Sequence, residues 1–185
     1  MGLAEELYKD MPNAEGFGAG KYFDDGRYDL RVKSIKCITS RNASNGNAGK
    51  HFFTVEFEVL SSSNPGVEVG ESRSWQVKIE GNTYAFSDIK NFIFALCLDT
   101  DPKDAPPPKK NPELHAMATN IAMALSDEEF AAKADDVTQA FVADVVGMPV
   151  KLEAFKKATL AKPGKPAGVF TLHQWSPATA APAAA

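Results

Sequence analysis

Basic and aromatic residues recur on the same stretches of this sequence, and together they suggest one kind of chemistry. Single-stranded nucleic acid is bound by cationic side chains that follow the phosphates and by aromatic rings on which unpaired bases stack. The basic candidates are Lys33, Lys36, Arg41, Lys50, Arg73, Lys78, Lys151, Lys156 and Lys157. The stacking candidates are Phe52, Phe155, His173 and Trp175, each out of phase with the apolar neighbours expected to form a core. Trp75 is a further candidate, although its phase with Val77 and Ile79 favours the core.

The residue types that support catalysis or metal binding form no recognisable pattern. The histidines, His51, His115 and His173, are far apart and form no His-x3-His pair, and the chain has no Cys-x2-Cys. It also has no Gly-x-Ser-x-Gly nucleophile elbow. The apolar surroundings of Cys37 and Cys97 predict two buried thiols rather than a disulfide. We therefore expect no catalytic residues, no metal and no cofactor, and a binding protein rather than an enzyme.

Three consecutive strands within residues 26–81 must position most of the candidate residues. In the first strand, apolar and polar residues alternate, and the apolar set then shifts by one residue to Ile35 and Cys37. The shift predicts a β-bulge near Lys33 and Ser34, which would bend the strand as a small closed barrel requires. The next two strands alternate in the same way. Their predicted inward residues are Phe53, Val55, Phe57, Val59, Trp75, Val77 and Ile79.

A helix and a helical insertion follow the third strand. Ser87 can cap a helix that runs to about Leu98 and that would close one end of a barrel. Residues 99–146 contain a proline-rich stretch and then helical apolar spacing, which predicts a helical insertion that is acidic on its outer face. Within it, Ser126 and Glu129 form a capping box for the last helix.

Two strands end the predicted domain. In the last one we expect Phe170 and Leu172 to face inward and Trp175 to face outward. The order β-β-β-α-(insertion)-β-β predicts a mainly β fold, a five-stranded OB-fold-like barrel. The corresponding divisions are a flexible lead-in over 1–25, one domain over 26–177 with its insertion at 99–146, and a disordered Ala/Pro tail over 178–185.

Charge is distributed unevenly along the chain, whose formal net charge is -4. Residues 1–25 and 99–146 together carry sixteen acidic and six basic residues, whereas 26–98 and 147–175 carry eight acidic and fourteen basic residues. A local cationic groove on an acidic protein would give this distribution, and so would chance clustering of surface charge.

The termini and the apolar runs predict a cytoplasmic protein without a membrane partner. The acidic N-terminus lacks the basic and apolar regions of a signal peptide. The longest apolar run, residues 92–98, is far too short to span a bilayer.

Several segments carry a resemblance to a known family. They are DDGRYDLRVKSIKCITSRN, KHFFTVEFEVLSSSNPGVEVGESRSWQV, SDIKNFIFAL, GMPVKLEAF and GVFTLHQWSP, which together cover 26–98 and 147–177. They include a Gly-x-Tyr strand start, an FxVEFxVL strand and a terminal Phe-Thr-x-His-x-Trp-x-Pro. The sequence resembles bacteriophage single-stranded DNA-binding proteins of the OB-fold type.

The resemblance implies a protein that binds and protects single-stranded DNA, without reading its sequence, during phage replication or recombination. Its partners would be single-stranded DNA, with further copies of itself and replication proteins as candidates, in the host cytoplasm. An alternative is a structural or assembly module of the virion type, in which the same barrel buries its outward aromatic rings against copies of itself. Small barrels support many functions, so the fold does not separate the two.

Overall fold

Five strands and four helices make up the part of the chain that the computed structural model describes, which is residues 21–41, 46–82, 84–159 and 168–178. The strands are β1 (Gly26–Thr39), β2 (His51–Ser62), β3 (Ser72–Lys78), β4 (Pro149–Thr159) and β5 (Gly168–Pro177). The helices are α2 (Ala85–Cys97), α3 (Pro112–Ser126), α4 (Glu128–Lys133) and α5 (Asp136–Asp144). The predicted mainly β class is confirmed. Most of the predicted lead-in and the Ala/Pro tail from residue 179 lie outside the described residues.

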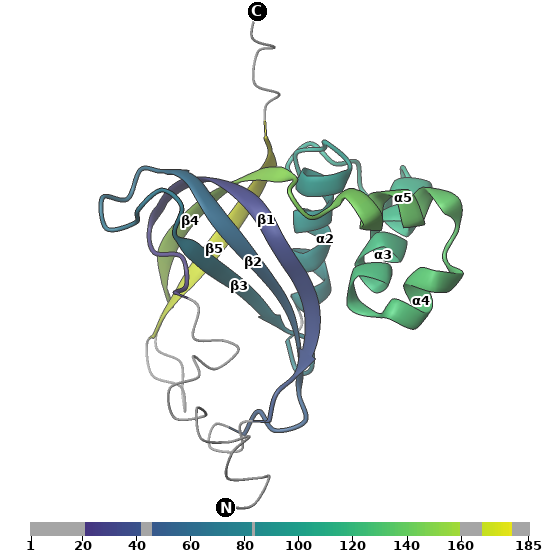
Figure 1. Cartoon of the computed structure of the whole chain (residues 1–185), viewed down its shortest axis with the longest axis horizontal. Helices are drawn as coiled ribbons and strands as arrows, with labels where there is room; N and C mark the ends of the chain where they lie inside the picture. Colours follow the sequence, from purple (N-terminus) through teal and green to yellow (C-terminus); the bar gives the residue numbers. More distant parts are fainter. Residues whose placement is uncertain (1–20, 42–45, 83, 160–167, 179–185) are drawn as a thin grey trace, which may run out of the picture.

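All five strands form one antiparallel sheet in the order β3-β2-β1-β4-β5 (Figure 1). The long central strand β1 pairs with β2 along its length but with β4 only from Gly26 to Arg31. Its register against β2 shifts between Val32 and Ser34, which confirms the predicted bulge, and a second shift follows Asp29. Bulges increase the local bend of a strand. The predicted inward residues of β2 are all buried, as are Trp75 and Val77 of β3.

The two edges of the sheet approach each other through side chains. Among the described residues, β3 and β5 are the edges, and backbone pairing does not close the sheet into the expected barrel. Instead, the rings of Trp75 on β3 and Trp175 on β5 have centroids 5.0 Å apart. Phe92, from α2, lies 5.3 Å from Trp75 and 5.0 Å from Trp175 between ring centroids. The opening between the edges is therefore filled by an aromatic cluster.

Helix α2 packs against β3, β4 and β5. Its N-cap residue is Tyr84, three residues before the predicted cap Ser87, and Tyr84 makes no side-chain capping bond. Ile89, Phe92 and further residues of one face are buried, whereas Phe86 in the first turn is 68% exposed.

The helical insertion contributes residues to the main apolar core. Asn111 caps α3 by accepting a hydrogen bond from the backbone N–H of Leu114 at 3.1 Å. Ala118 and Ile121 of α3 are fully buried within the main apolar cluster, and α3 lies against α2 and β1.

Two short helices, α4 and α5, replace the single helix predicted from Ser126. The side chains of Asp127 and Asp135 accept backbone hydrogen bonds at their N-termini, so each aspartate starts its own helix. Ser126 instead ends α3 and donates a hydrogen bond to the carbonyl oxygen of Ala122 at 2.8 Å. None of the helices that the structure describes has the length and apolar character needed to cross a membrane.

The segment just before β1 packs on the sheet, although we expected it to belong to a flexible lead-in. Phe23 is 3% exposed, and its ring centroid lies 5.0 Å from that of Tyr28 and 5.9 Å from that of Phe57. Lys21 forms a parallel bridge with Arg73 at the edge strand β3. An aromatic side chain that can enter the core explains why this segment is held in place.

Candidate nucleic-acid interface

The outer surface of β1, β2 and β3 carries a predicted stacking ring close to two lysines. Directly opposed residues of adjacent strands share a face, and the register places Ile38 and Lys78 on either side of Phe52. Lys36 lies on the same face one row further along. Phe52 is half-buried, and Lys78 Nζ donates a hydrogen bond to Asn47 Oδ1 at 2.9 Å. This surface therefore combines an aromatic ring with two ammonium groups.

A second aromatic ring reaches this surface from the segment before β1. The hydroxyl of Tyr22 donates a hydrogen bond to Gln76 Oε1 at 2.9 Å, and Tyr22 is 54% exposed. Gln76 is opposite Thr54, in the same row as Lys36. We name Tyr22, Lys36, Phe52, Gln76 and Lys78 the outer-face patch. The sequence argument missed Tyr22 because it assigned residues 1–25 to a flexible lead-in.

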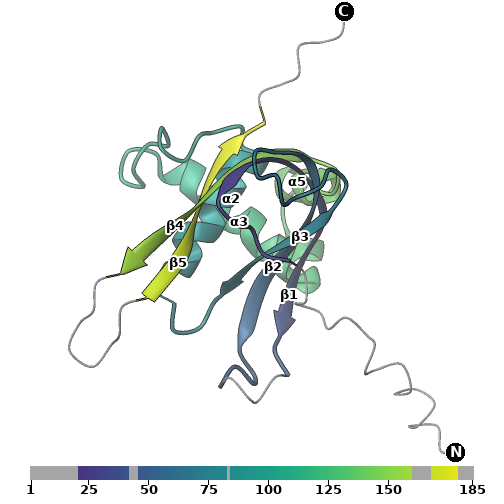
Figure 2. The same cartoon turned by 90° about the vertical axis from the view of Figure 1, so that its left-hand side faces the viewer.

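Further candidates lie at the free end of the β4–β5 hairpin. Phe155 is half-buried opposite Leu172, and the exposed Lys157 is opposite Phe170. Lys156 is exposed on the other face, with its Nζ 3.6 Å from Asp24 Oδ1. Figure 2 shows that this end of the hairpin projects on the same side of the molecule as the β1–β2 end.

The remaining basic candidates are spread over the sheet. Arg41 is exposed and Lys50 half-buried at the β1–β2 end, close in sequence to the outer-face patch. Lys33 is exposed at the bulge, where its Nζ donates a hydrogen bond to Ser72 Oγ at 2.9 Å. Lys151 is half-buried near the start of β4, opposite Asp29 and Ser176. The structure thus gathers Arg41, Lys50, Lys156 and Lys157 at the hairpin ends and leaves Lys151 apart from them.

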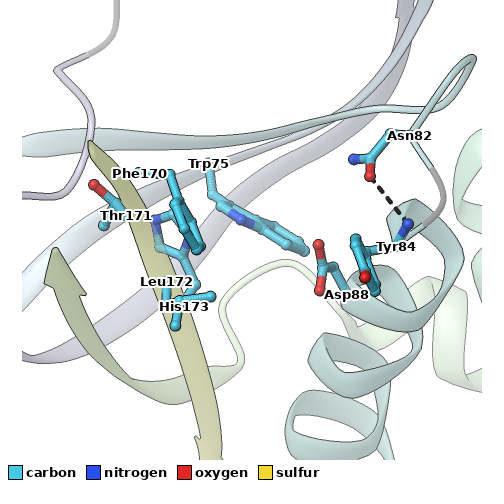
Figure 3. Close-up of a pocket in the computed structure, with 8 residues that line it drawn as sticks. All are labelled: Trp75, Asn82, Tyr84, Asp88, Phe170, Thr171, Leu172 and His173. Atoms are coloured by element: carbon cyan, nitrogen blue, oxygen red, sulfur yellow. Dashed lines mark hydrogen bonds between the residues drawn. The ribbon is translucent and has the colours of Figure 1, made fainter. Parts of the chain in front are cut away.

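A pocket of about 460 Å³ lies between β3, β5 and the start of α2. Its lining residues are Trp75, Asn82, Tyr84, Asp88, Phe170, Thr171, Leu172 and His173 (Figure 3). The Trp75 and His173 ring centroids are 6.3 Å apart in an edge-to-face arrangement. Tyr84 is 72% exposed and Phe170 is 42% exposed, so aromatic rings are accessible on both the α2 and the β5 side. Such a pocket can receive a flat ring.

Asp88 and His173 are the acidic and the basic side chain among the described residues that line the pocket. Burial lowers the pKa of His173 to about 4, so its imidazole is neutral at pH 7. Burial raises the pKa of the Asp88 carboxyl. Figure 3 shows the Asp88 side chain directed from α2 toward the indole of Trp75. No lysine or arginine is among these lining residues, so the pocket is unsuited to a phosphate.

Trp175 is not the outward stacking ring that we expected. It is 3% exposed and lies opposite Leu152, with its ring centroid 5.6 Å from that of Phe57. The expected phase of β5 was wrong, because Trp175 and not Leu172 is needed to fill the opening between the sheet edges. His173 shares this inward phase, so it lines the pocket instead of an outer surface. Trp75 is 4% exposed, as its phase with Val77 favoured.

Arg73 is also placed inside, so it cannot serve as an outward phosphate contact. It is 5% exposed. Its guanidinium donates hydrogen bonds to the carbonyl oxygen of Tyr22 at 2.7 Å and to Glu71 Oε2 at 3.2 Å. The carboxylate of Glu71 is shared with Lys21, and these two basic partners help to lower its pKa. Arg73 therefore holds the segment before β1 against β3.

The exposed rings of Tyr84 and Phe170 were missed as candidates by the sequence argument. A signal was present for Tyr84, because a large aromatic residue before a helix whose apolar face is already complete has no core position to fill. Phe170 was assigned to the core by the wrong phase of β5. Among the described residues, no three His, Cys, Asp or Glu side chains come together as a possible metal-binding group.

The functional assignment depends on the geometry of the site. No protein-family model matches the chain, and a search of curated proteins finds no match.

Proposed function

We propose that this chain is a single-stranded DNA-binding protein of the bacteriophage OB-fold type, acting in DNA replication or recombination in the host cytoplasm. It would bind and protect the strand largely without reading its sequence. In this proposal the chain is a binding protein and needs no cofactor.

The outer-face patch is the observation that carries the proposal. Its rings, Tyr22 and Phe52, are accessible to different degrees and lie with Lys36 and Lys78 on one face of three adjacent strands. Stacking of bases on aromatic rings and pairing of phosphates with ammonium groups are the two contributions that sequence-independent single-strand binding requires. The basic residues at the two hairpin ends extend this surface at one side of the sheet.

The fold proposal is an OB-type barrel that is open between β3 and β5. The OB fold is a five-stranded, partly open Greek-key barrel whose loops and second and third strands bind oligonucleotides. The observed strand order and the helix between β3 and β4 support this assignment. The aromatic cluster of Trp75, Phe92 and Trp175 then takes the place of the missing backbone pairing.

A fluorescence-polarisation titration with labelled oligo-dT and a duplex of equal length, at several salt concentrations, tests the proposal. We expect the single strand to bind more tightly, because stacking needs bases with free faces. If about three to five phosphates are contacted, log affinity should fall against log salt with a slope of roughly -2 to -3.5. Equal affinity for duplex, or no dependence on salt, would contradict the proposal.

Variants that remove positive charge test whether Lys36 and Lys78 contact phosphates. The double variant Lys36→Ala/Lys78→Ala should reduce the size of the salt slope by about 1.4, which is about 0.7 for each lost phosphate contact. The matched control, Lys109→Ala/Lys110→Ala, removes the same charge from the exposed connection between α2 and α3 and should leave the slope unchanged. Equal effects of the two variants would mean that only net charge matters.

The assembly module remains the second reading, and one observation favours it. A groove on α5 is lined by Val137, Ala140, Phe141 and Met148 together with two aspartates, and Val137 is 55% exposed. A protein that forms stable oligomers in size-exclusion chromatography and shows no oligo-dT binding would support this reading.

A further inference from the structure

The carboxylate of Asp88 is a feature of the aromatic pocket that phosphate binding does not explain. It lies beside Trp75 and Tyr84 in the pocket. The pocket is separate from the outer-face patch that we assign to phosphates, which a carboxylate repels. The neighbouring His173 is neutral at pH 7 and offers no compensating charge. To a nucleotide that enters the pocket, this carboxylate can offer hydrogen bonds only to groups that donate them.

The edges of the four DNA bases differ in what they donate. An ionised carboxylate only accepts hydrogen bonds, and its two oxygens can accept two parallel N–H groups. Guanine has two such groups side by side, N1–H and one hydrogen of the 2-amino group. Adenine and cytosine present one amino group next to an acceptor nitrogen, and thymine presents one N–H between two carbonyl oxygens. Guanine is therefore the base that matches a carboxylate in two hydrogen bonds.

The other lining residues suit a base rather than a sugar or a phosphate. Trp75, Tyr84 and Phe170 come from β3, the start of α2 and β5, so the aromatic surface is not confined to one wall. The volume of about 460 Å³ is within the range of roughly 300–1,000 Å³ that is usual for small-molecule sites. Asp88 is exposed, so a base that enters the pocket can reach its carboxyl group, whose pKa is raised by partial desolvation.

We propose that this pocket binds one guanine base of a single DNA strand, with the Asp88 carboxylate accepting hydrogen bonds from N1–H and the 2-amino group. The inference rests on the proposed single-strand binding and deepens it. The outer-face patch holds a strand of any sequence, and the pocket favours those alignments of the strand that place a guanine in it.

Oligo-dT carrying a single central substitution tests the pocket. The wild-type protein should bind the oligonucleotide with one dG about tenfold more tightly than unsubstituted oligo-dT or the oligonucleotide with one dA, in the lower part of the range for a bidentate pair. Deoxyinosine lacks the 2-amino group, so its oligonucleotide should lose most of this preference. Equal affinity of the wild-type protein for the dG and dT oligonucleotides would overturn the inference while leaving the proposed function intact.

The variant Asp88→Asn should abolish the preference for dG and leave the affinity for oligo-dT unchanged or higher, because a repulsive charge is lost. Its matched control is Asp136→Asn, since Asp136 is also an acidic residue in the first turn of a helix. This control should keep the preference. A full preference for dG in Asp88→Asn would overturn the assignment of the carboxylate.

Free guanosine separates the pocket from strand binding. Guanosine, but not thymidine, should shift the NMR signal of the Trp75 indole N–H in the wild-type protein and in Phe86→Ala, whose ring is exposed but does not line the pocket. The shift should be lost in Asp88→Asn and reduced in Tyr84→Ala. If no oligonucleotide binds but guanosine does, strand binding is refuted and the pocket is supported. If guanosine causes no shift, the pocket assignment is wrong.

Discussion

Replacement of Trp175 should separate packing from DNA contact most clearly. The Trp175 ring is 3% exposed, and its centroid lies 5.0 Å from those of Trp75 and Phe92 and 5.6 Å from that of Phe57. Truncation of a buried aromatic side chain to alanine typically costs about 3–5 kcal/mol. Because three ring contacts are lost together, we expect Trp175→Ala to lower the free energy of unfolding by an amount in the upper half of that range.

Trp175→Phe should cost less, about 1–2 kcal/mol. The smaller ring leaves part of the volume empty, but the substitution also removes the buried indole N–H, which has no hydrogen-bond partner among the described residues. Urea denaturation followed by far-UV circular dichroism measures both changes, and oligo-dT titration of the same samples measures the affinity of the folded molecules. Wild-type stability together with a tenfold loss of affinity in Trp175→Ala would refute the packing assignment.

Three further predictions concern buried groups. The pKa of His173 is about 4 in the folded chain and about 6.5 when unfolded, so the unfolded chain binds more protons between these values; the free energy of unfolding should therefore fall by up to about 3 kcal/mol as the pH is lowered from 7 to 4, and His173→Gln should flatten this part of the urea-derived profile. Burial raises the pKa of the Cys97 thiol to about 12, so a thiol reagent at pH 8 should modify the half-buried Cys37 first, and faster modification of Cys97 in the native protein would contradict its placement. Ile121→Ala should cost about 2–5 kcal/mol in thermal or urea unfolding because Ile121 is fully buried, whereas Met123→Ala, on the exposed side of the same helix, should cost less than about 1 kcal/mol.

The strands that could be predicted from the sequence are those with one buried face and one solvent-exposed face. In β2 the alternation from Phe53 to Val59 has no competing apolar set, so the pattern alone determines the inward side. The bulge of β1 was predicted because the alternation of apolar and polar residues also defines the inward side of that strand. Ile35 can face the core only if one residue is left out of the register. These arguments need no knowledge of the rest of the chain.

The phase of β5 could not be predicted in this way. Phe170 and Leu172 favour one phase, and Trp175 favours the other. The choice depends on the opening between the sheet edges, which only a large ring fills. Arg73 was misplaced for a related reason. Its phase with Trp75 indicates an inward position, but it was counted among the outward basic residues. A buried arginine needs partners, and the carbonyl oxygen of Tyr22 and the carboxylate of Glu71 supply them.

The lysines and Phe52 of the candidate site were named from the sequence, but the pocket was not. The pocket combines the end of β3, the start of α2 and the start of β5, which are far apart in sequence. No spacing rule brings Asp88 and Phe170 together before the fold is known. The break between α4 and α5 was missed because a capping box at Ser126 looked sufficient, whereas Asp127 and Asp135 each cap a helix.

The placement of Trp175 on the last strand has a consequence for the synthesis of the protein. The aromatic surface formed by Phe57, Trp75 and Phe92 is available once α2 has emerged from the ribosome, but Trp175, which covers it, follows about 80 residues after the end of α2. At translation rates of about 5–20 residues per second, that interval lasts roughly 4–16 s. During this time the nascent chain exposes the apolar aromatic surface of an incomplete core. A chain that is released or stalls before β5 is therefore expected to bind chaperones or to aggregate.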